Sequence, residues 1–389
     1  MVSNRHIVHV MGTLHAGGVQ KLVLGLANAP ALRGCRHSAV CTSSTTGELA
    51  PQFAEAGVPS LDCPFPWPYR RPLLSYKLSR LVRHALKWTF PHRLARVLRR
   101  MKADLVHTHI TSHIDLQAVG IMSRARLPWV WTIHGLYKPE GKELARWRRA
   151  TALVRQGRAR ITADSTPVAE DFVQRGAGAA KEIKVAHAGA DVKRFHSIRP
   201  RDTQWRARWK IPTDALLFGS CGRLVPEKAY EVFIRAAALL LRLAPEVHFV
   251  IAGTGRVKAM LETEIDRLSI GRNFHLVGFQ EDVAQFLRQL DIFVLSSRSE
   301  GFPLALIEAL ASGLPCVATD AGGVREMLGN NAGLIVPAES PELLAVAMQA
   351  LLVSEERRSF ASEGATMAQQ YSFEVCADKF AAVYAELLK

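Results

Sequence analysis

The chain has few cysteines and no long apolar segment. None of its six cysteines, in 389 residues, forms a Cys-x-x-Cys pair, which argues against a disulfide scaffold and a cysteine-rich zinc site. No apolar run approaches the roughly 20 residues that cross a bilayer. The N-terminal residues also lack the long apolar stretch of a signal peptide. We therefore expect a protein with reduced thiols in the cytoplasm.

Motifs that bind phosphates or metals are also missing. Gly12 and Gly17 have the spacing of a Walker A loop, but Gly18 and Val19 stand where that loop needs Lys and Ser/Thr. There is no Gly-x-Gly-x-x-Gly and no Asp-x-Asp. If a diphosphate ligand binds here, cationic side chains and helix N-termini must neutralise it, because no site for a divalent ion is evident.

Acidic residues are absent from one long stretch. Between Asp62 and Asp104 there is no Asp or Glu, whereas eleven cations in this stretch supply most of the formal net charge of +15. We call the stretch between Asp62 and Asp104 the basic block. A local concentration of charge indicates one binding surface. The cations are Arg70, Arg71, Lys77, Arg80, Arg83, Lys87, Arg93, Arg96, Arg99, Arg100 and Lys102.

The basic block has a helical pattern over 72–102. Apolar and basic stripes separate at helical spacing, Pro91 is expected to end a first helix, and a second helix follows. This pattern favours contact with an anionic membrane surface through 70–102. Alternatively, the apolar stripe packs on its own domain. Nucleic-acid binding lacks a supporting motif. The stripes contain Leu74, Leu78, Leu81, Ala85 and Trp88 (apolar), Lys77, Arg80, His84 and Lys87 (basic), and Leu94, Val97, Leu98 and Met101 (second helix).

Short apolar, β-branched runs alternate with helical patterns along the chain. This alternation predicts βαβ units, parallel sheets and an α/β fold with two Rossmann-like, doubly wound domains. The segment Lys193–Pro212 is polar, basic and strandless, so we expect domains over 1–195 and 213–371, a linker over 196–212 and a terminal helix over 372–389. The predicted strands are His6–Val10, Ser38–Thr42, Asp104–His109, Trp129–Ile133, Arg160–Ala163, Ile183–Ala186, Leu216–Ser220, His248–Ala252, Phe274–Val277, Ile292–Ser296, Cys316–Thr319 and Gly333–Val336.

Two glycine-containing turns follow predicted strands. Gly17 and Gly18 open a helix after the first strand, where the backbone can approach an anion, although taken alone they are better explained by a plain turn. In the second half, Arg223 and Lys228 follow a strand at the edge where open α/β sheets bind ligands. Two cations there suit a pyrophosphate, and the alternative is solvated surface charge.

The segment from Ser296 to Asp320 carries the strongest signal. A buried strand ends in a loop with Glu300 and Gly301, and Pro303 fits the first position of a helix that contains Glu308. Both carboxylates can point into a crevice at the strand ends. Free N–H groups around Gly301 and Phe302 would complete a site for an anion and hydroxyl groups. The alternative is a capping Glu and a surface Glu.

Histidines lie at two strand ends in the first half. His107 and His109 end one strand, and His134 ends the next. Taking histidines two apart on a strand to face opposite ways, we expect that His107 and His109 cannot both line one pocket. We therefore predict no metal site.

Taken together, these residues resemble the retaining family 4 glycosyltransferases of the GT-B fold, and the likeness covers nearly the whole chain. Glu300 and Glu308 match the family's E-x7-E motif. The other matching segments are AGGVQKLVLGLA, VHTHI, WTIHG, GRLVPEK and ATDAGGVREML. The resemblance implies two domains facing a central cleft and transfer of a sugar from a nucleotide-sugar. It implies no cofactor, because the nucleotide-sugar is a substrate.

The resemblance also implies roles for individual residues. Arg223 and Lys228 would bind the diphosphate and stabilise its leaving charge. Glu300 would hold hydroxyls of the donor sugar, Glu308 the ribose, and His134 the sugar or the reacting centre. No nucleophile is assigned. The implied catalytic residues are Glu300, His134, Arg223 and Lys228, and the implied donor-binding residues are Gly17, Gly18, Arg223, Lys228, Phe279, Glu300, Gly301, Phe302, Leu304 and Glu308.

Three positions depart from the family pattern. Ala229 replaces the glycine common after the lysine, and Pro303 stands where glycine is frequent. Ala188 and Gly189 replace an asparagine-glycine pair, so a hydrogen bond from that asparagine is in doubt.

The resemblance implies a transferase that uses a nucleotide-sugar, with UDP-sugars favoured over GDP-mannose, and we expect a saccharide or lipid-linked saccharide as acceptor. We expect it to act in cell-envelope polysaccharide or glycolipid synthesis, peripherally at the inner membrane face. The alternatives are a GT-B epimerase or phosphorylase, a GDP-mannose-dependent mannosyltransferase, and a non-enzymatic protein that binds through the basic block.

Overall fold

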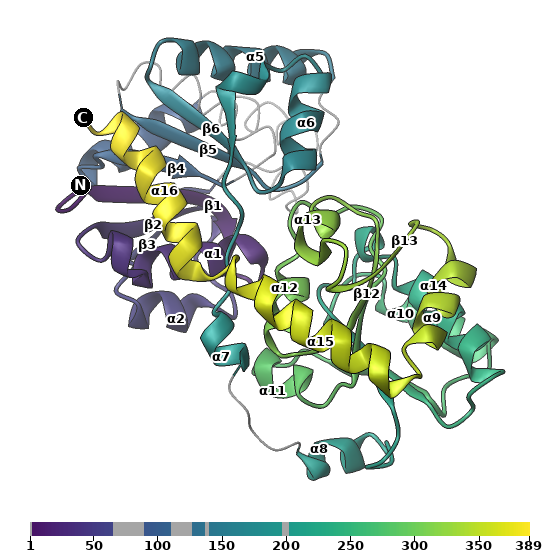
Figure 1. Ribbon diagram of the computed structural model, residues 1–389. Coiled ribbons are helices and arrows are strands. Elements are labelled where there is room, and N and C mark those ends of the chain that lie inside the picture. The colour runs from purple at the N-terminus through teal and green to yellow at the C-terminus, as the bar shows by residue number, and fades with distance from the viewer. Residues whose placement is uncertain (1, 65–88, 110–126, 137–139, 197–201) are drawn as a thin grey trace, which may run out of the picture. The chain divides into compact units, whose positions relative to one another are not determined.

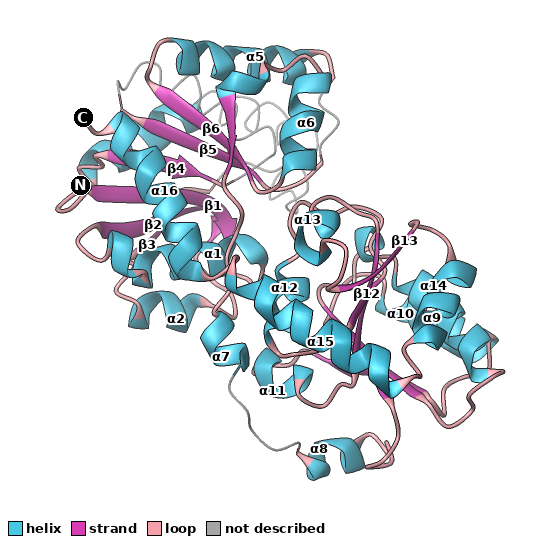
Figure 2. Ribbon diagram, in the orientation of Figure 1, coloured by secondary structure: helices cyan, strands magenta, loops and turns pink. Residues whose placement is uncertain are grey.

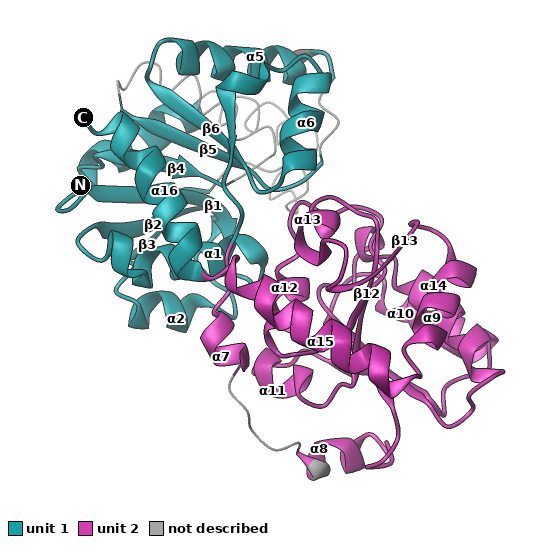
Figure 3. Ribbon diagram, viewed as in Figure 1, with its two compact units in different colours: residues 1–188, 373–389 teal, residues 189–372 magenta. Residues whose placement is uncertain are grey.

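The computed structural model describes residues 2–64, 89–109, 127–136, 140–196 and 202–389 (Figure 1). The chain divides into two compact units (Figure 3). The first unit contains Met1–Ala188 and Phe373–Lys389, and the second contains Gly189–Ser372. The sequence analysis placed 189–195 in the first domain and a linker over 196–212, whereas this division assigns both segments to the second unit.

A parallel sheet of seven strands forms the centre of the first unit (Figure 2). Its strand order is β3-β2-β1-β4-β5-β6-β7. The strands are β1 (His6–Thr13), β2 (Arg36–Ser44), β3 (Ser60–Asp62), β4 (Leu105–Thr108), β5 (Trp129–Ile133), β6 (Ala159–Ala163) and β7 (Ile183–Val185). Helices include α1 (Gly18–Asn28), α2 (Ala50–Glu55), α5 (Lys142–Arg155), α6 (Thr166–Gln174) and α16 (Phe373–Leu387).

The C-terminal helix α16 belongs to the core of this first unit. Phe380 and Tyr384 are fully buried in a cluster with Ile7 of β1. A side chain at Gly25 of α1 would collide with Phe373, because a Cβ there would lie 2.2 Å from the Phe373 ring. Glycine therefore lets α1 and the start of α16 pack closely (Figure 1).

The second unit has a parallel sheet of six strands in the order β10-β9-β8-β11-β12-β13. Its strands are β8 (Leu217–Cys221), β9 (His248–Ala252), β10 (Phe274–Gly278), β11 (Ile292–Leu295), β12 (Cys316–Thr319) and β13 (Gly333–Val336). Its helices include α7 (Val192–His196), α8 (Thr203–Arg208), α9 (Tyr230–Leu241), α10 (Lys258–Arg267), α11 (Val283–Leu287), α12 (Leu304–Ala311), α13 (Val324–Leu328), α14 (Pro341–Ala350) and α15 (Ser354–Gln369).

A buried arginine fixes α8 to this sheet. The Arg206 side chain is almost fully buried and donates hydrogen bonds to backbone carbonyls, including that of Gln289 at 2.6 Å. It also pairs with Asp291 at 3.2 Å. The segment expected to be a linker thus includes a helix with its own buried anchor.

The sequence predicted this architecture correctly. All twelve predicted strands are present, with ends that differ by at most three residues, and both sheets are parallel. The short strand β3 was missed because its three residues are half-buried or exposed and carry no apolar pattern. Pro303 precedes α12 as its N-cap residue, although it was predicted to be the first helical residue.

The basic block is only partly described. Residues 65–88 lie outside the described ranges, and with them the first predicted helix. Residues 89–100 are helical, so the second helix includes Pro91, whereas we expected it to follow this proline. Its apolar residues Phe90, Leu94 and Leu98 are fully buried in the first unit's core. Internal packing therefore explains the apolar stripe of this part.

The cations of the same helix are available to solvent. Arg96, Arg99 and Arg100 are exposed. Across the ranges described, no helix is both long enough and apolar enough to cross a bilayer.

Candidate active site

Two charged site residues meet at the carboxyl edge of the second sheet. Strands β8 and β11 are paired and parallel, so the loops that follow them emerge at the same edge. Lys228 comes from the loop after β8 and Glu300 from the loop after β11. The Lys228 Nζ donates to the Glu300 Oε1 at 2.6 Å. The structure therefore brings together the two charged groups that the sequence placed 72 residues apart.

Neighbouring serines hold this ion pair in place. Ser297 donates its hydroxyl to the same Glu300 oxygen at 2.5 Å, and Ser296 donates to the Lys228 carbonyl at 3.0 Å. The side chains of Lys228 and Glu300 are only 19% and 11% exposed. The ammonium and the carboxylate are thus fixed in orientation yet still accessible to a ligand.

The Gly253-Thr254-Gly255 segment supports the loop that carries Arg223. A Cβ at Gly253 would lie 1.8 Å from the Gly222 carbonyl oxygen, and one at Gly255 would lie 2.2 Å from that of Leu224. The Leu224 N–H donates to the Thr254 carbonyl at 2.8 Å. These glycines are therefore required for close backbone packing. Arg223 itself is exposed beside this supported loop.

A second pair of glycines supports the Glu300 loop. A Cβ at Gly322 would lie 2.1 Å from the Glu300 carbonyl oxygen. The Gly323 N–H donates to the Gly301 carbonyl at 2.8 Å. The Gly-Gly turn after β12 therefore holds the backbone just before α12.

The remaining predicted donor residues of this unit differ in exposure. Glu308, on α12, is only 3% exposed, so the sequence alternative of a surface Glu is wrong. Phe302 and Leu304 are also buried, and the Phe302 ring packs edge-on against Tyr371 with centroids 5.0 Å apart. Phe279, just after β10, is 48% exposed and presents an aromatic face to solvent.

In the first unit, the glycine loop lies between β1 and α1. Gly17 is the N-cap residue of α1 and has no side chain to cap the helix, so helix N–H groups remain available to an anion. Glu48 fixes this loop by accepting from the Ala16 N–H at 3.0 Å and from His15 Nδ1 at 2.9 Å. Backbone amides and His15 lower the pKa of Glu48 to about 2. Sequence reasoning missed Glu48, which belongs to no local motif.

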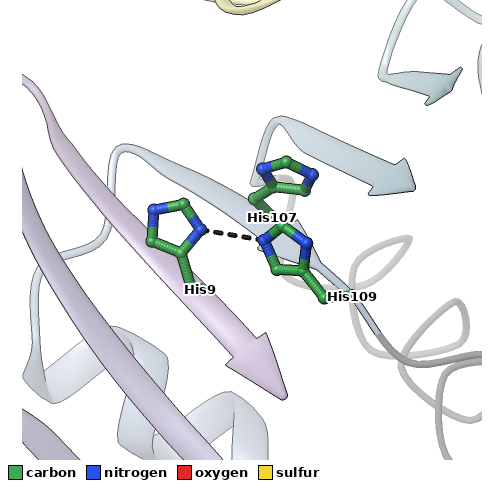
Figure 4. Close-up of side chains that lie close together, drawn as sticks. All are labelled: His9, His107 and His109. Atoms are coloured by element: carbon green, nitrogen blue, oxygen red, sulfur yellow. Dashed lines mark hydrogen bonds between the residues drawn. The ribbon is translucent and has the colours of Figure 1, made fainter. Parts of the chain in front are cut away.

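The histidine prediction for this unit is wrong. The ring centroids of His107 and His109 lie 3.8 Å apart. Side chains two apart in a strand point to the same face, so the expectation that these two histidines face opposite ways is wrong. His9 of β1 joins them, and nitrogens of the three buried rings lie within 4.8 Å of one another (Figure 4).

These three rings belong to a larger network that includes His134. His9 Nε2 contacts His37 Nδ1 at 3.0 Å, and His9 Nδ1 contacts His109 Nε2 at 3.0 Å. His109 Nδ1 contacts His134 Nε2 at 3.2 Å. His134 Nδ1 lies 3.7 Å from the Asp164 Oδ2. The sequence analysis missed His9, His37 and Asp164, because only tertiary contacts connect them to His134.

Hydrogen bonds already use the nitrogens of the three clustered histidines. His107 contacts the Tyr384 hydroxyl at 2.7 Å and the Thr132 hydroxyl at 2.6 Å. Both nitrogens of His9 and both of His109 contact other imidazoles. A metal ion would have to replace several of these bonds, so the arrangement favours a hydrogen-bonded network.

Burial keeps this network uncharged. Desolvation lowers the pKa of His9, His107 and His109 well below the usual 6.5, and neighbouring histidines lower it further. Desolvation also lowers the pKa of His37 to about 4. His9, His37, His107 and His109 are therefore neutral in the folded protein at neutral pH.

A separate cavity of about 650 Å³ lies elsewhere in the second unit. His248 begins β9 and His275 lies near the start of β10, so the cavity is at the amino edge of the sheet, opposite the Lys228–Glu300 pair. It is therefore not the predicted donor site. Its lining residues are Arg208, Trp209, Lys210, Pro212, His248, Gly271, Arg272 and His275.

We predict that the buried histidines make the fold sensitive to acid. Their folded pKa values are lowered, so only the unfolded chain binds these protons as the pH falls below 6.5. Stability is therefore complete above pH 6.5 and falls towards pH 4, by about 1.4 kcal/mol per pH unit for each histidine. Urea unfolding at pH 7.5, 6.5 and 5.5 measures this slope. His37→Gln should lower this slope by the contribution of one histidine, about 1.4 kcal/mol per pH unit. An unchanged slope in that variant would contradict the assignment.

Comparison with known proteins gives two family matches. Residues 16–194 match the model described as Glycosyltransferase Family 4, and residues 201–367 match Glycosyl transferases group 1. TuaC of Bacillus subtilis (strain 168), a glycosyltransferase assigned to teichuronic acid biosynthesis, is 30% identical over 69% of this chain and 68% of its own length. A D-inositol 3-phosphate glycosyltransferase of Thermomonospora curvata is 27% identical over 96% of this chain and 91% of its own length.

Solved structures show the same fold. Anabaena HepE, crystallised with UDP and glucose, has a TM-score of 0.81 at 20% identity, covering 99% of this chain and 100% of HepE. WaaG, a glycosyltransferase involved in lipopolysaccharide biosynthesis, has a TM-score of 0.71 at 17% identity, covering 97% of this chain and 99% of WaaG. The chain therefore belongs to the family 4 glycosyltransferases and has their GT-B fold of two Rossmann-like, parallel-sheet domains.

Proposed function

We propose that this glycosyltransferase is a retaining enzyme that transfers a sugar from a nucleotide-sugar, with a UDP-sugar favoured, to a saccharide or lipid-linked saccharide. The observation that carries this proposal is the contact of 2.6 Å between Lys228 and Glu300 at the ends of two adjacent strands. A cation for a diphosphate and a carboxylate for sugar hydroxyls then lie side by side. The crystallisation of HepE with UDP-glucose supports a UDP-sugar.

The ion pair suggests how the donor is received. Lys228 and Glu300 form an ion pair in the structure. Diphosphate oxygens offer the ammonium group a second anionic partner, and the carboxylate can then accept hydrogen bonds from sugar hydroxyls. Arg223 adds a second, exposed cation. As the bond to the sugar breaks, negative charge grows on the diphosphate, and both cations stabilise it.

Other residues complete the donor site in this proposal. Glu308 accepts hydrogen bonds from the ribose, and the exposed Phe279 lies beside the base. The backbone of Gly17 and Gly18, at the start of α1, approaches the diphosphate, and His134 contacts the sugar.

We predict that Arg223→Ala and Lys228→Ala each lower kcat/KM by about 10²–10³, because each removes a cation that stabilises the departing diphosphate. A thermal-shift panel of UDP- and GDP-sugars first identifies the donor, since a ligand at 100 times its Kd stabilises by about 2.7 kcal/mol. Steady-state kinetics with that donor then tests the variants.

Lys228→Ala also leaves Glu300 without its cation, so the double variant Lys228→Ala with Glu300→Gln separates the two effects. Lys258→Ala is a matched control, because this exposed lysine pairs with Glu262 on α10. Near-normal turnover in both Arg223→Ala and Lys228→Ala would refute the proposed donor site.

The proposed transfer does not require a metal ion. Arg223, Lys228 and the N-terminus of α1 supply the positive charge that a divalent cation supplies in other transferases. We predict that activity persists after treatment with EDTA and dialysis. Loss of activity on chelation, with recovery on adding Mg²⁺ or Mn²⁺, would show that these cations are insufficient.

We also propose that the enzyme acts at the cytoplasmic membrane face in envelope polysaccharide or glycolipid synthesis. Two relatives, TuaC and WaaG, carry names from teichuronic acid and lipopolysaccharide biosynthesis. The exposed Arg96, Arg99 and Arg100 offer a cationic surface on a helix whose apolar side is buried. In this proposal, charge brings the described part of the basic block to anionic lipids.

We predict binding to vesicles that contain phosphatidylglycerol and little binding to phosphatidylcholine vesicles. Each cation near the surface adds about 1 kcal/mol, and high salt reverses the attraction. Changing Arg96, Arg99 and Arg100 to Glu should weaken co-sedimentation at least tenfold.

The matched control reverses three exposed cations elsewhere in the first unit, Arg33, Arg149 and Lys181. Equal co-sedimentation of the two triple variants would mean that total charge, and not this helix, binds the vesicles.

A further inference from the structure

The four connected histidines are joined in one consistent direction. At each contact, Nδ1 of one ring faces Nε2 of the next: His37 to His9, His9 to His109, and His109 to His134. Nδ1 of the last ring, His134, faces Asp164. We call this series the histidine chain.

The carboxylate at one end decides where the protons lie. A neutral imidazole has one N–H and one lone pair, and an ionised carboxylate can only accept. Nδ1 of His134 must therefore carry its proton, which leaves Nε2 of His134 to accept from the Nδ1–H of His109. Likewise, Nδ1 of His9 carries a proton and donates to Nε2 of His109, and Nδ1 of His37 donates to Nε2 of His9.

The opposite direction is unfavourable. It would place the bare Nδ1 lone pair of His134 against the Asp164 carboxylate, at 3.7 Å. In the favoured direction, the nitrogen left bare is His37 Nε2, at the other end. That buried atom has no hydrogen-bond partner among the described residues.

We propose that Asp164 sets the direction of the histidine chain, so that all four rings are neutral Nδ1–H tautomers and His134 acts on the substrate as a hydrogen-bond donor and not as a base. This inference rests on the proposed function only for the role of His134. Asp164, His109, His9 and His37 are positioning residues, because they act through His134.

The distance from His134 to Asp164 leaves the donor usable. At 3.7 Å, the two atoms are farther apart than a hydrogen bond allows. The carboxylate therefore orients the Nδ1–H by charge, and this N–H can still donate a hydrogen bond to another group. The other nitrogen, Nε2, is occupied by His109. His134 is 12% exposed, and its only remaining polar function is an N–H that can reach a sugar or phosphate oxygen.

Other groups around the chain disfavour an extra positive charge. His107 packs against His109, and its nitrogens are bonded to Tyr384 and Thr132. His6 lies nearby and is bonded to Ser38 and to the Met101 carbonyl. Neither residue supplies a negative charge. Asp164 is therefore the acidic group that faces the chain among the described contacts, and the Leu32 carbonyl near His37 is a weaker, uncharged acceptor.

Nitrogen-15 NMR of the full-length protein with labelled histidine tests the tautomers directly. Between pH 6.5 and 8, we expect His134, His109, His9 and His37 to show a protonated Nδ1 and a bare Nε2. Asp164→Asn should shift the chain towards Nε2–H, because an amide can donate to Nδ1 of His134. Nε2–H forms in the wild type, or a pattern that Asp164→Asn leaves unchanged, would overturn the proposal.

Kinetics tests the role of His134. Asp164→Asn should lower kcat by about 10², the cost of one transition-state donor, and leave nucleotide affinity unchanged. His6→Gln is the control, because His6 is buried and hydrogen-bonded but lies outside the chain. The opposite outcome is a kcat that rises with pH on the acid side, with a midpoint that Asp164→Asn shifts. That result would identify His134 as a base and overturn the donor role.

Two further outcomes are distinguishable. If the wild type transfers sugar from no nucleotide-sugar tested, the proposed function fails, while the NMR spectra still decide the direction of the chain. The second outcome concerns metal binding and is tested by titrating the protein with Zn²⁺ alone. Stoichiometric binding that removes the His9 and His109 imidazole N–H signals would show a metal site in place of the hydrogen-bonded chain, and would overturn the proposal.

Discussion

The loops of the proposed site in the second unit are arranged around the half-buried contact between Lys228 and Glu300. Two opposite charges removed from bulk water are stable only when their geometry is held and their remaining hydrogen bonds are satisfied. Ser297 satisfies the carboxylate. Glycines at 253 and 322 let supporting backbone approach the two loops closely. Gly253 and Gly322 therefore serve the close backbone packing that supports the loops carrying these two charges.

Much of this half could be predicted from the sequence because the relevant signals are local. Apolar runs such as Ile292–Leu295 mark strands buried on both faces, and polar residues directly after them lie at the ligand-binding edge of a parallel sheet. That rule placed Lys228 and Glu300 at one edge without any knowledge of which strands are neighbours. The pairing of β8 with β11 then converts a shared edge into a contact.

The first half was harder because its site depends on contacts between distant segments. The expectation that His107 and His109 face opposite ways is wrong, because side chains two apart in a strand share a face, and the centroids of the two rings lie 3.8 Å apart. His9 and His37 lie on strands that look like ordinary core strands, and Asp164 follows β6 with no recognisable motif. Nothing within a short window shows that these side chains form one network. Only the order of β2, β1, β4, β5 and β6 in the sheet brings them together.

The return of α16 to the first unit has a consequence for synthesis on the ribosome. The hydroxyl of Tyr384 contacts His107, and Phe380 completes the core beside β1, so the first unit lacks part of its interior until α16 is translated. The second unit is continuous from Gly189 to Ser372 and has no such requirement. Domains usually fold from the N-terminus as the chain emerges. Here most of the first unit is translated first, but its core is completed only after the second unit has been translated. Until then, an apolar face of the first unit is uncovered and needs protection.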